Sequence, residues 1–251
     1  MSMAVEKKVR IDQCLVERGL APSRAKAQAM VMAGVVIVND RRVERSSEAV
    51  HPDDQIRVKG ESAASRYVGR GGLKLEAALD AWKIDPDGWN CIDIGSSTGG
   101  FTDCLLQRGA LKVTAVDSGT NQLDWRLRKD PRVKVMERTN ARTLSPQDVD
   151  GPFDLAVMDV SFISVTKIIP NLMSLLKKNG KLIVLIKPQF EVGKGEVGKG
   201  GIVREPEKHA RVVKEVTEFA VSLGLSAEGM IESPIMGAEG NREFLALYER
   251  N

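Results

Sequence analysis

The feature that most constrains the fold is the regular alternation of strand and helix patterns from residue 73 to the C-terminus. Strand patterns occupy residues 90–94, 112–117, 133–137, 153–159, 182–186, 227–231 and 244–248, and helical patterns occupy residues 73–81, 101–109, 167–178 and 207–223. Strands separated by helices favour a doubly wound, mostly parallel sheet. Residues 182–186 are apolar throughout, which is typical of a central strand buried on both faces. We therefore expect an α/β fold with a seven-stranded sheet.

A different pattern covers the first sixty residues. Residues 9–18 have the pattern of a helix, and a second helix begins at Pro22-Ser23 and ends at Gly34. Short strands follow at residues 35–38, 41–44 and 55–59. We therefore predict a small α+β domain at residues 1–60, a linker at residues 61–65 and the α/β domain at residues 66–251.

The charge of the chain is unevenly distributed. There are 37 Lys and Arg residues against 34 Asp and Glu residues, a net charge of +3. Residues 1–60 hold 11 of these basic residues and 8 of the acidic ones, so the whole excess falls within the first domain. A local basic bias is typical of nucleic-acid-binding modules. From charge alone, a solvated basic face is an equally good interpretation.

Cysteine and histidine are too few and too scattered for most disulfide or metal chemistry. The cysteines are Cys14, Cys91 and Cys104, and the histidines are His51 and His209. This set excludes a disulfide framework and a zinc ribbon, and it indicates a reducing compartment. No signal peptide is recognisable, and the longest apolar run is about half of the ~20 residues that cross a bilayer. We expect a cytoplasmic protein with no metal and no membrane partner.

A glycine-rich loop joins the strand at residues 90–94 to the following helix. Its sequence is Asp93-Ile94-Gly95-Ser96-Ser97-Thr98-Gly99-Gly100-Phe101. Open α/β sheets bind ligands at such loops, because glycines let the ligand approach the backbone and the helix N-terminus offers free N–H groups. Asp117 ends the next strand, 18 residues after Gly99, where a carboxylate commonly binds ribose hydroxyls.

The Gly-x-x-x-Gly spacing of this loop is similar to that of S-adenosylmethionine-dependent methyltransferases. A nicotinamide cofactor remains an alternative for the loop taken alone. The residues expected to bind the cofactor are Asp93, Gly95, Ser97, Thr98, Gly99, Gly100, Phe101, Asp117, Asn140 and Asp159.

Four ionisable residues stand at element ends that face the same edge of the predicted sheet: Lys74, Asp159, Lys187 and Glu243. Methyl transfer to a hydroxyl needs an aligned cofactor, a base for the hydroxyl proton and positive charge near the oxygen. Each of these residues alone is best interpreted as a surface charge. Their joint placement favours a catalytic site.

The order Lys74, Asp159, Lys187, Glu243 resembles the Lys-Asp-Lys-Glu tetrad of FtsJ-type 2′-O-ribose methyltransferases. Stretches similar to one branch, the TlyA or hemolysin A-like family, lie at residues 65–76, 93–102, 158–164, 185–191 and 240–244. Residues 10–12, 23–27 and 34–39 resemble the RNA-binding domain of the fourth small-subunit ribosomal protein. One local departure is Ser96, where this branch is expected to have Ala.

The resemblance implies an S-adenosylmethionine-dependent enzyme that methylates cytidine ribose in rRNA. Lys187 would be the base for the 2′-hydroxyl, and Asp159 would orient Lys187 and contact the methionyl side of the cofactor. Lys74 and Glu243 would position the target ribose and balance charge. The partners implied are rRNA or ribosomal subunits, and the chain is expected to be a monomer or weak dimer.

RNA contacts are expected from basic residues of both domains: Arg10, Arg24, Lys26, Arg41, Arg66 and Arg70. Phosphate contacts of this kind position an RNA stem without reading its sequence. The glycine-dense residues 191–201 are interpreted as a lid that places Lys194 and Lys199 near phosphates. A plain mobile loop is an equally good interpretation.

Three other functions remain open at this point. The first is a non-catalytic RNA-binding or ribosome-assembly protein, against which retention of all four tetrad positions argues. The second is a membrane-active hemolysin, as the family label suggests, although no spanning segment supports it. The third is a protein or small-molecule methyltransferase, in which the N-terminal domain would have no task.

Overall fold

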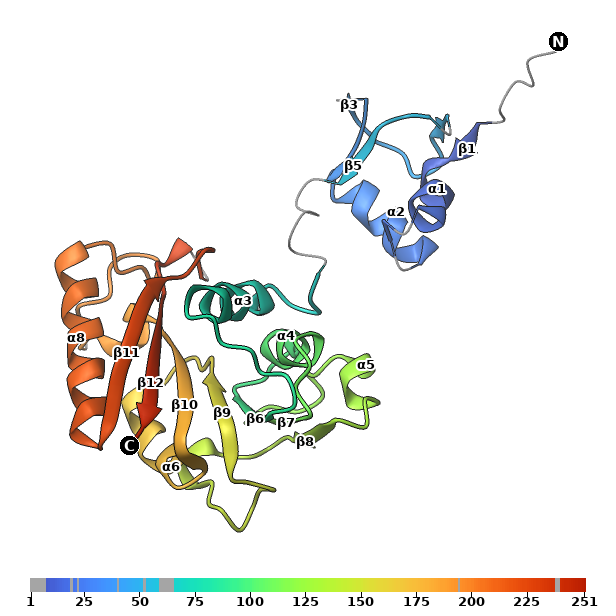
Figure 1. Ribbon diagram of the computed structural model, residues 1–251. Helices are drawn as coiled ribbons and strands as arrows, with labels where there is room; N and C mark the ends of the chain where they lie inside the picture. Colours follow the sequence, from blue (N-terminus) through green and yellow to red (C-terminus); the bar gives the residue numbers. More distant parts are fainter. Residues whose placement is uncertain are drawn as a thin grey trace. The chain divides into compact units, whose positions relative to one another are not determined.

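The computed structural model of the chain describes residues 8–18, 20–21, 23–39, 41–51, 53–58, 66–193, 195–237 and 240–251. The chain divides into two compact units, residues 1–65 and residues 66–251, and each is treated separately here. The expected linker at residues 61–65 lies outside the described residues. Figure 1 labels the elements of both units.

The described part of the N-terminal unit packs two helices, α1 (Ile11–Glu17) and α2 (Arg24–Met32), against short antiparallel strands. The strands are β1 (Val9–Arg10), β2 (Val36–Val38), β3 (Arg41–Arg42), β4 (Ala49–Val50) and β5 (Ile56–Val58). The sheet order is β3-β2-β5, and β1 pairs separately with β4. Residues 9–10 were expected to begin a helix, and this is wrong because they pair with β4 instead.

In the described part of the second unit, the strands form one seven-stranded sheet in the order β11-β12-β10-β9-β6-β7-β8 (Figure 1). The strands are β6 (Asn90–Ile94), β7 (Lys112–Val116), β8 (Val133–Met136), β9 (Phe153–Met158), β10 (Leu176–Ile186), β11 (Leu225–Glu232) and β12 (Phe244–Arg250). Only β12 runs antiparallel to its neighbours β10 and β11, and the remaining pairs are parallel. The predicted mostly parallel, seven-stranded sheet is confirmed.

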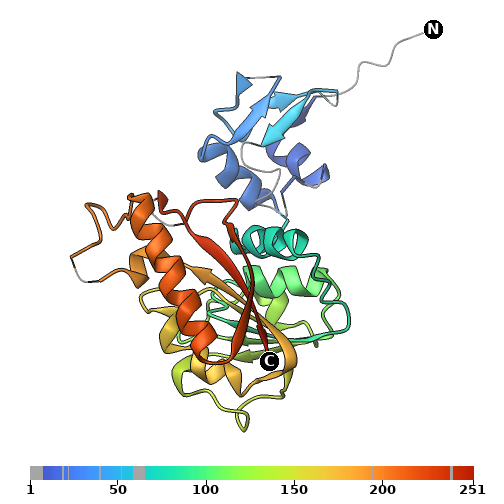
Figure 2. The same cartoon turned by 60° about the vertical axis from the view of Figure 1, so that its left-hand side comes forward.

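Helices cover both faces of this sheet (Figure 2). They are α3 (Gly71–Ala81), α4 (Gly100–Gln107), α5 (Trp125–Arg128), α6 (Ile169–Met173), α7 (Pro188–Glu191) and α8 (Pro206–Ser222), with single 3₁₀ turns η1 (Ala141–Thr143) and η2 (Val165–Lys167). Successive residues of β9 face opposite layers, as the period of a strand requires. Leu155 and Val157 pack with α3 and α4, whereas Ala156 and Met158 pack with α6 and α8.

The sheet places a crevice between β6 and β9. The chain leaves β6 toward β7 and leaves β9 toward β10, and β7 and β10 lie on opposite sides of the β6–β9 pair. Doubly wound sheets bind their ligands at the carboxyl ends of strands at such a switch point. Ile94 and Met158 are paired across it, so the loops that follow them start side by side.

The predicted helix at residues 167–178 is wrong over its second half. Helix α6 ends at Met173, and β10 already begins at Leu176, which pairs in parallel with Phe153. The strand is irregular between Leu176 and Lys181, and Asn179 adopts a left-handed φ of 61°. The apolar residues of this segment fit a helical period, but their burial beside β9 decides the structure. Tertiary pairing here overrides local pattern.

None of the helices in the described residues combines the length and the apolar character that crossing a bilayer requires.

Candidate active site

Two adjoining cavities lie at the switch point, and they share Gly95, Ser97 and Asp159. The smaller, here called the α3 cavity, has a volume of about 230 Å³ and is also lined by residues of α3 and by Met236. The larger, here called the β7 cavity, has a volume of about 380 Å³ and is also lined by Asp117 at the end of β7. One extended ligand could therefore occupy both.

The glycine loop reaches this position because two of its residues cannot carry a side chain. Gly95 has a φ of +85°, and a Cβ there would lie 2.3 Å from the carbonyl oxygen of Asp159. Gly99 has a φ of +99°, and a Cβ there would lie 2.2 Å from Leu127. Both the left-handed conformation and the close contacts require glycine. The loop can thus press against the loop that follows β9, while the N–H groups of Gly95, Ser96 and Gly99 are used in backbone hydrogen bonds within the protein.

Asp117 fixes the far side of the loop. Its carboxylate accepts hydrogen bonds from the backbone N–H groups of Ser97 at 2.8 Å and Gly119 at 2.7 Å. The walls of the β7 cavity beside it are largely apolar, formed by Ile94, Val116, Ala141, Val160, Ile163 and Ile168. A carboxylate at one end of an apolar slot suits a nucleoside, whose ribose carries hydroxyl donors and whose base is planar and weakly polar.

Most residues expected to bind the cofactor border these cavities. Eight of the ten do so: Gly95, Ser97, Thr98, Gly100, Phe101, Asp117, Asn140 and Asp159. Asp93 and Gly99 are not among the described residues that line either cavity. Gly99 packs against α5, and Asp93 is fully buried below the loop.

Asp93 supports the start of α4 from within the core. One oxygen of its carboxyl group accepts a hydrogen bond from the Thr102 hydroxyl at 2.7 Å. The other, Oδ1, has no hydrogen-bond partner among the described residues. Burial in this site raises the pKa of Asp93 to about 7, since desolvation penalises the charged form.

The raised pKa of Asp93 predicts a pH-dependent stability. An unfolded Asp titrates near ~3.9, so between about pH 4 and pH 7 the folded protein binds the additional proton. The free energy of unfolding should therefore decrease as pH rises through this window. We expect the thermal midpoint to fall less steeply from pH 5 to pH 8 in Asp93→Asn than in the native protein. Parallel midpoint-against-pH curves for the two proteins would contradict this.

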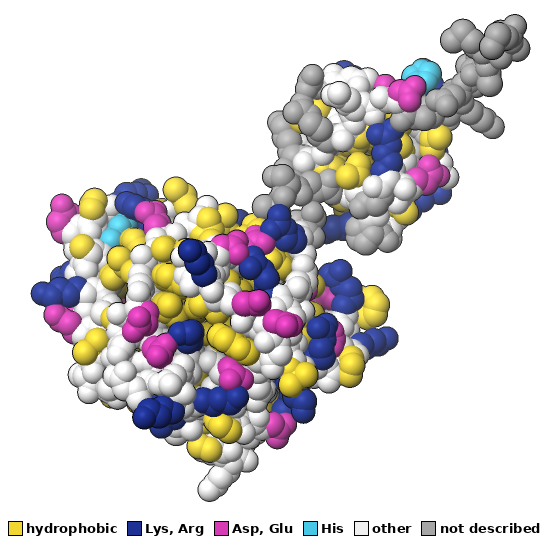
Figure 3. All heavy atoms as spheres, in the orientation of Figure 1, with side chains coloured by type: hydrophobic (Ala, Val, Ile, Leu, Met, Phe, Trp, Pro, Cys, Tyr) yellow, Lys and Arg dark blue, Asp and Glu magenta, His cyan; other side chains and the backbone are white. Residues whose placement is uncertain are grey.

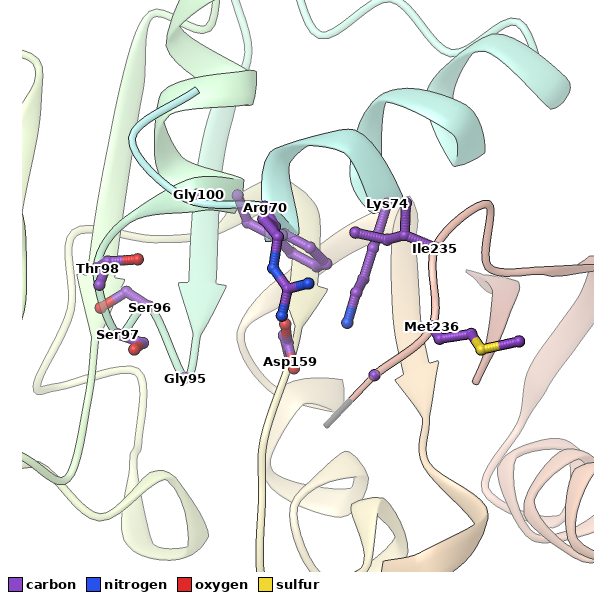
Figure 4. A pocket seen from close by; sticks show the side chains of 13 residues that line it. Arg70, Lys74, Gly95, Ser96, Ser97, Thr98, Gly100, Asp159, Ile235 and Met236 are labelled. Carbon is purple, nitrogen blue, oxygen red and sulfur yellow. The ribbon is translucent and has the colours of Figure 1, made fainter. Parts of the chain in front are cut away.

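The four tetrad residues form two ion pairs, of which Lys74–Glu243 is buried and Lys187–Asp159 is partly buried, with the Asp159 side chain 22% exposed. Lys74 Nζ lies 2.5 Å from Glu243 Oε2, and Lys187 Nζ lies 2.5 Å from Asp159 Oδ1. Lys187 also donates to the hydroxyl of Ser161 at 2.9 Å. Lys74 and Lys187 are each 8% exposed and Glu243 only 2%. Figure 4 shows Lys74, Arg70 and Asp159 projecting into the same hollow.

Neighbouring loops hold these pairs in place. A Cβ at Gly237 would lie 2.0 Å from Glu243 Oε1, so this segment packs directly on that carboxylate. Glu191, just after Lys187, accepts from the Ser164 hydroxyl at 2.6 Å and from the Val165 N–H at 2.8 Å. It therefore ties the turn that follows β10 to the loop that follows β9. Burial raises the pKa of Glu191 above its ordinary value.

Ser161 and Phe162 are among the residues of the site that the sequence analysis did not single out. Phe162 lines the β7 cavity with its side chain 91% exposed, its φ is +65°, and its ring centroid lies 5.2 Å from that of Phe190. An exposed aromatic in a left-handed conformation is unusual for a residue without function. The sequence feature that could have identified Phe162 is its position three residues after Asp159. An aromatic residue beside a strand is, however, normally interpreted as part of the hydrophobic core.

Most residues expected to contact RNA are engaged within the protein. Arg10 and Arg24 donate to the buried carboxylate of Asp12 at 2.9–3.0 Å, and Gln28 donates to it as well. The hydrogen bonds from Arg10 dominate in holding the pKa of Asp12 well below its usual range. The arginines keep outward-facing surface, with side chains 41% and 51% exposed.

The other expected RNA contacts differ in their surroundings. Arg41 pairs with Glu48, and Arg66 pairs with Glu76. Lys26 is exposed on α2, and Arg70 lines the α3 cavity. Their roles toward RNA stay predictions.

The expected lid is only partly described, because Lys194 lies outside the described residues. Lys199 is exposed. Glu196 pairs with Arg211, which ties this segment to α8. The lid stays a prediction.

Comparison with known proteins resolves the family. Residues 67–250 match the FtsJ-like methyltransferase family, and residues 9–56 match the S4 domain. The chain belongs to the FtsJ-like methyltransferase family. The predicted enzyme class and fold are thereby confirmed, and the nicotinamide alternative for the glycine loop is excluded.

Relatives of this FtsJ-like methyltransferase match along nearly its whole length. The Bacillus subtilis protein YqxC is named as a candidate rRNA methyltransferase. It is 50% identical over 95% of this chain and 85% of that protein. The 16S/23S rRNA (cytidine-2′-O)-methyltransferase TlyA of Mycobacterium tuberculosis is 44% identical over 95% of this chain and 88% of that protein. A solved Streptococcus thermophilus protein named as a candidate hemolysin has a TM-score of 0.76 and 45% identity, over 98% of this chain and 90% of that chain. The resemblance to the TlyA family is confirmed.

Proposed function

We propose that this protein transfers a methyl group from S-adenosylmethionine to the ribose 2′-hydroxyl of a cytidine in rRNA. The observation that carries the proposal is the pairing of the buried Lys187 with Asp159, whose partly exposed carboxylate borders both cavities. The name of the TlyA relative supports the substrate. We expect the partner to be rRNA or a ribosomal subunit in the bacterial cytoplasm.

The residues present fit the cofactor. Asp117 offers a carboxylate to the ribose hydroxyls, and the apolar wall with Ala141 and Ile163 accommodates adenine. Asp159, shared by both cavities, offers negative charge to the cationic sulfonium and amino groups. When bound, S-adenosylmethionine supplies an electrophilic methyl group that an oxygen nucleophile attacks in line.

Lys187 is oriented to take the proton of the 2′-hydroxyl. In the deprotonated form that can act as a base, the amine has two N–H groups, which match the two acceptors Asp159 and Ser161, and one lone pair. The lone pair is then left for the substrate hydroxyl. Once protonated, the same amine places positive charge beside the ribose 2′-oxygen that has lost its proton, which favours alkoxide character at that oxygen. Ser161 is thus a positioning residue for Lys187.

Lys74 and Glu243 position the target ribose and do not take part in removing the hydroxyl proton. Lys74 lines the α3 cavity while its amine is held by Glu243. Its remaining N–H groups are available to ribose or phosphate oxygens entering this cavity. Arg70, on the same wall, offers a guanidinium to the adjoining phosphate.

Phe162 provides a stacking face for the target base. Its exposed ring lines the β7 cavity beside the reacting groups. Stacking of a base on an aromatic side chain contributes about 1–3 kcal/mol. We expect Phe162→Ala to lower kcat/KM for rRNA by about 10- to 100-fold with unchanged stability. Phe162→Tyr should retain most activity, and equal activity of the Ala and Tyr variants would argue against a stacking role.

Purified protein and in vitro transcribed rRNA test the proposal. With S-adenosylmethionine labelled in its methyl group, the label should enter rRNA and appear in 2′-O-methylcytidine after digestion to nucleosides. Label in a methylated base or in protein would contradict the proposal. RNA binding without any methyl transfer, including with intact ribosomal subunits, would support a non-catalytic RNA-binding protein instead.

A further inference from the structure

The charge of the second unit is concentrated in one short segment. Residues 125–142 contain seven Lys and Arg residues and two Asp and Glu residues, a net charge of +5. The remainder of residues 66–251 holds 19 basic and 23 acidic residues, a net charge of −4. The near-neutral total of this unit therefore conceals a strongly polarised surface.

This segment forms one edge of the sheet. It runs from α5 through the edge strand β8 to η1, and α5 packs against β8. Six of its basic residues are exposed, and we call them the basic strip: Arg126, Lys129, Arg132, Lys134, Arg138 and Arg142. Dark-blue side chains gather on this side of the unit in Figure 3. The indole of Trp125, 64% exposed, lies 5.1 Å from the Lys129 amine.

The strip borders the proposed active site. Arg138 and Arg142 flank the three residues Thr139, Asn140 and Ala141, all of which line the β7 cavity. Backbone hydrogen bonds from Arg138 to Gly119 and from Thr139 to Asp117 fix the segment against that cavity. The arginine side chains are therefore held at the rim rather than on a distant surface.

The strip is available to an external anion. Arg126 pairs with Asp124, Arg132 with Asp130 and Lys134 with Asp150, but the basic side chain of each pair is 42–60% exposed. Exposed ion pairs contribute little stability and exchange readily. Within the part of the chain that the structure describes, Arg138 and Arg142 form no ion pair with a carboxylate.

We propose that the basic strip binds the phosphodiester backbone of the RNA that flanks the target nucleotide. This inference rests on the proposed function for the choice of RNA. A row of separate cations along an edge suits regularly spaced phosphates, and Trp125 adds a face on which an unpaired base can stack. The net negative remainder of the unit repels RNA elsewhere, so the field would orient the strand toward the cavity.

The test compares two triple variants of the full chain. One is Lys129→Gln, Arg138→Gln and Arg142→Gln, in the strip. The matched control is Lys112→Gln, Lys178→Gln and Lys214→Gln, three exposed lysines elsewhere in the same unit. Binding to in vitro transcribed rRNA is measured over a series of salt concentrations without cofactor.

We expect the strip variant to bind rRNA about 10-fold or more weakly, with a salt slope reduced in magnitude by about 2. The control should match the native protein. Equal effects of the two triple variants, or no effect of either, would overturn the proposal. So would unchanged rRNA binding with lost binding to phosphatidylglycerol vesicles, which would indicate a membrane surface.

Two further measurements keep the outcome clear. Cofactor binding by calorimetry should be equal in all three proteins, since none of the substituted residues lines the α3 cavity or the β7 cavity. If the triple variant of the strip loses cofactor binding, the double variant Lys129→Gln and Lys134→Gln, whose positions are away from Asn140, takes its place in the RNA-binding comparison. Because binding needs no turnover, weakened binding would stand even if the native protein transferred no methyl group.

Discussion

Replacement of Lys187 by Ala should lower the rate of methyl transfer by about 10³-fold, since a positioned general base typically contributes 10²- to 10⁴-fold. Cofactor binding should survive, because the residues that line the β7 cavity do not include Lys187. The measurements are single-turnover methyl transfer to rRNA and calorimetric binding of S-adenosylmethionine. The amine is 8% exposed and directed by two acceptors, so bulk water is a poor substitute for it.

Lys178→Ala is the matched control for this experiment. Lys178 lies on the same strand, β10, but it is exposed. Its removal should leave the rate unchanged. Lys187→Arg should remain as inactive as Lys187→Ala, because a guanidinium keeps the charge but does not act as a base. Turnover by Lys187→Ala near the native rate would remove Lys187 from the proposed mechanism.

Loss of Glu243 should damage both stability and activity. Glu243→Ala leaves the buried amine of Lys74 without its carboxylate, and breaking such a pair costs about 3–5 kcal/mol. The free energy of unfolding is measured by denaturant titration. Activity should fall in the same variant, because Lys74 is no longer held at the wall of the α3 cavity.

A paired replacement separates the two effects. Lys74→Met with Glu243→Leu removes both charges and keeps apolar volume, so stability should return to near the native value. Methyl transfer should stay low, because the amine that we propose contacts the ribose is gone. Recovery of activity together with stability would show that this pair serves the fold alone.

The fold was largely predictable because the strands of its sheet appear in the sequence as apolar runs at regular intervals. The apolar residues 182–186 predicted β10. The glycine loop and Asp117 predicted the ends of two successive strands, β6 and β7. Prediction failed where pairing rather than pattern decides. Residues 176–178 continue a helical pattern but belong to β10, whose Leu176 pairs with Phe153 of β9, and residues 9–10 pair with β4. Such contacts are distant in sequence and leave no local signal.

The sequence singled out residues that the structure brings together, but it did not indicate their contacts. The tetrad positions follow from the ends of elements, yet no spacing indicated that Lys74 pairs with Glu243 and Lys187 with Asp159. Asp93 was expected to bind the cofactor, and the structure instead buries it beneath the loop. A carboxylate at the end of a strand can point into the crevice or into the core, and only the packing of α4 distinguishes these.

Charge was the most misleading quantity at the level of sequence. Totals over whole domains assigned the basic character to residues 1–60, where Arg10 and Arg24 share their charge with buried Asp12. The +5 segment at residues 125–142 disappeared in a sum over the second domain. Its meaning depends on the sheet edge and the cavity rim that gather it, which are properties of the fold.

The central claim is that this protein methylates cytidine ribose in rRNA, and nucleotide-resolution mapping of 2′-O-methyl groups tests it most directly. rRNA from cells that lack the protein is compared with rRNA from the same cells supplied with the native chain or with Lys187→Ala. We expect at least one cytidine to be 2′-O-methylated only with the native chain. Identical maps in all three samples would contradict the account.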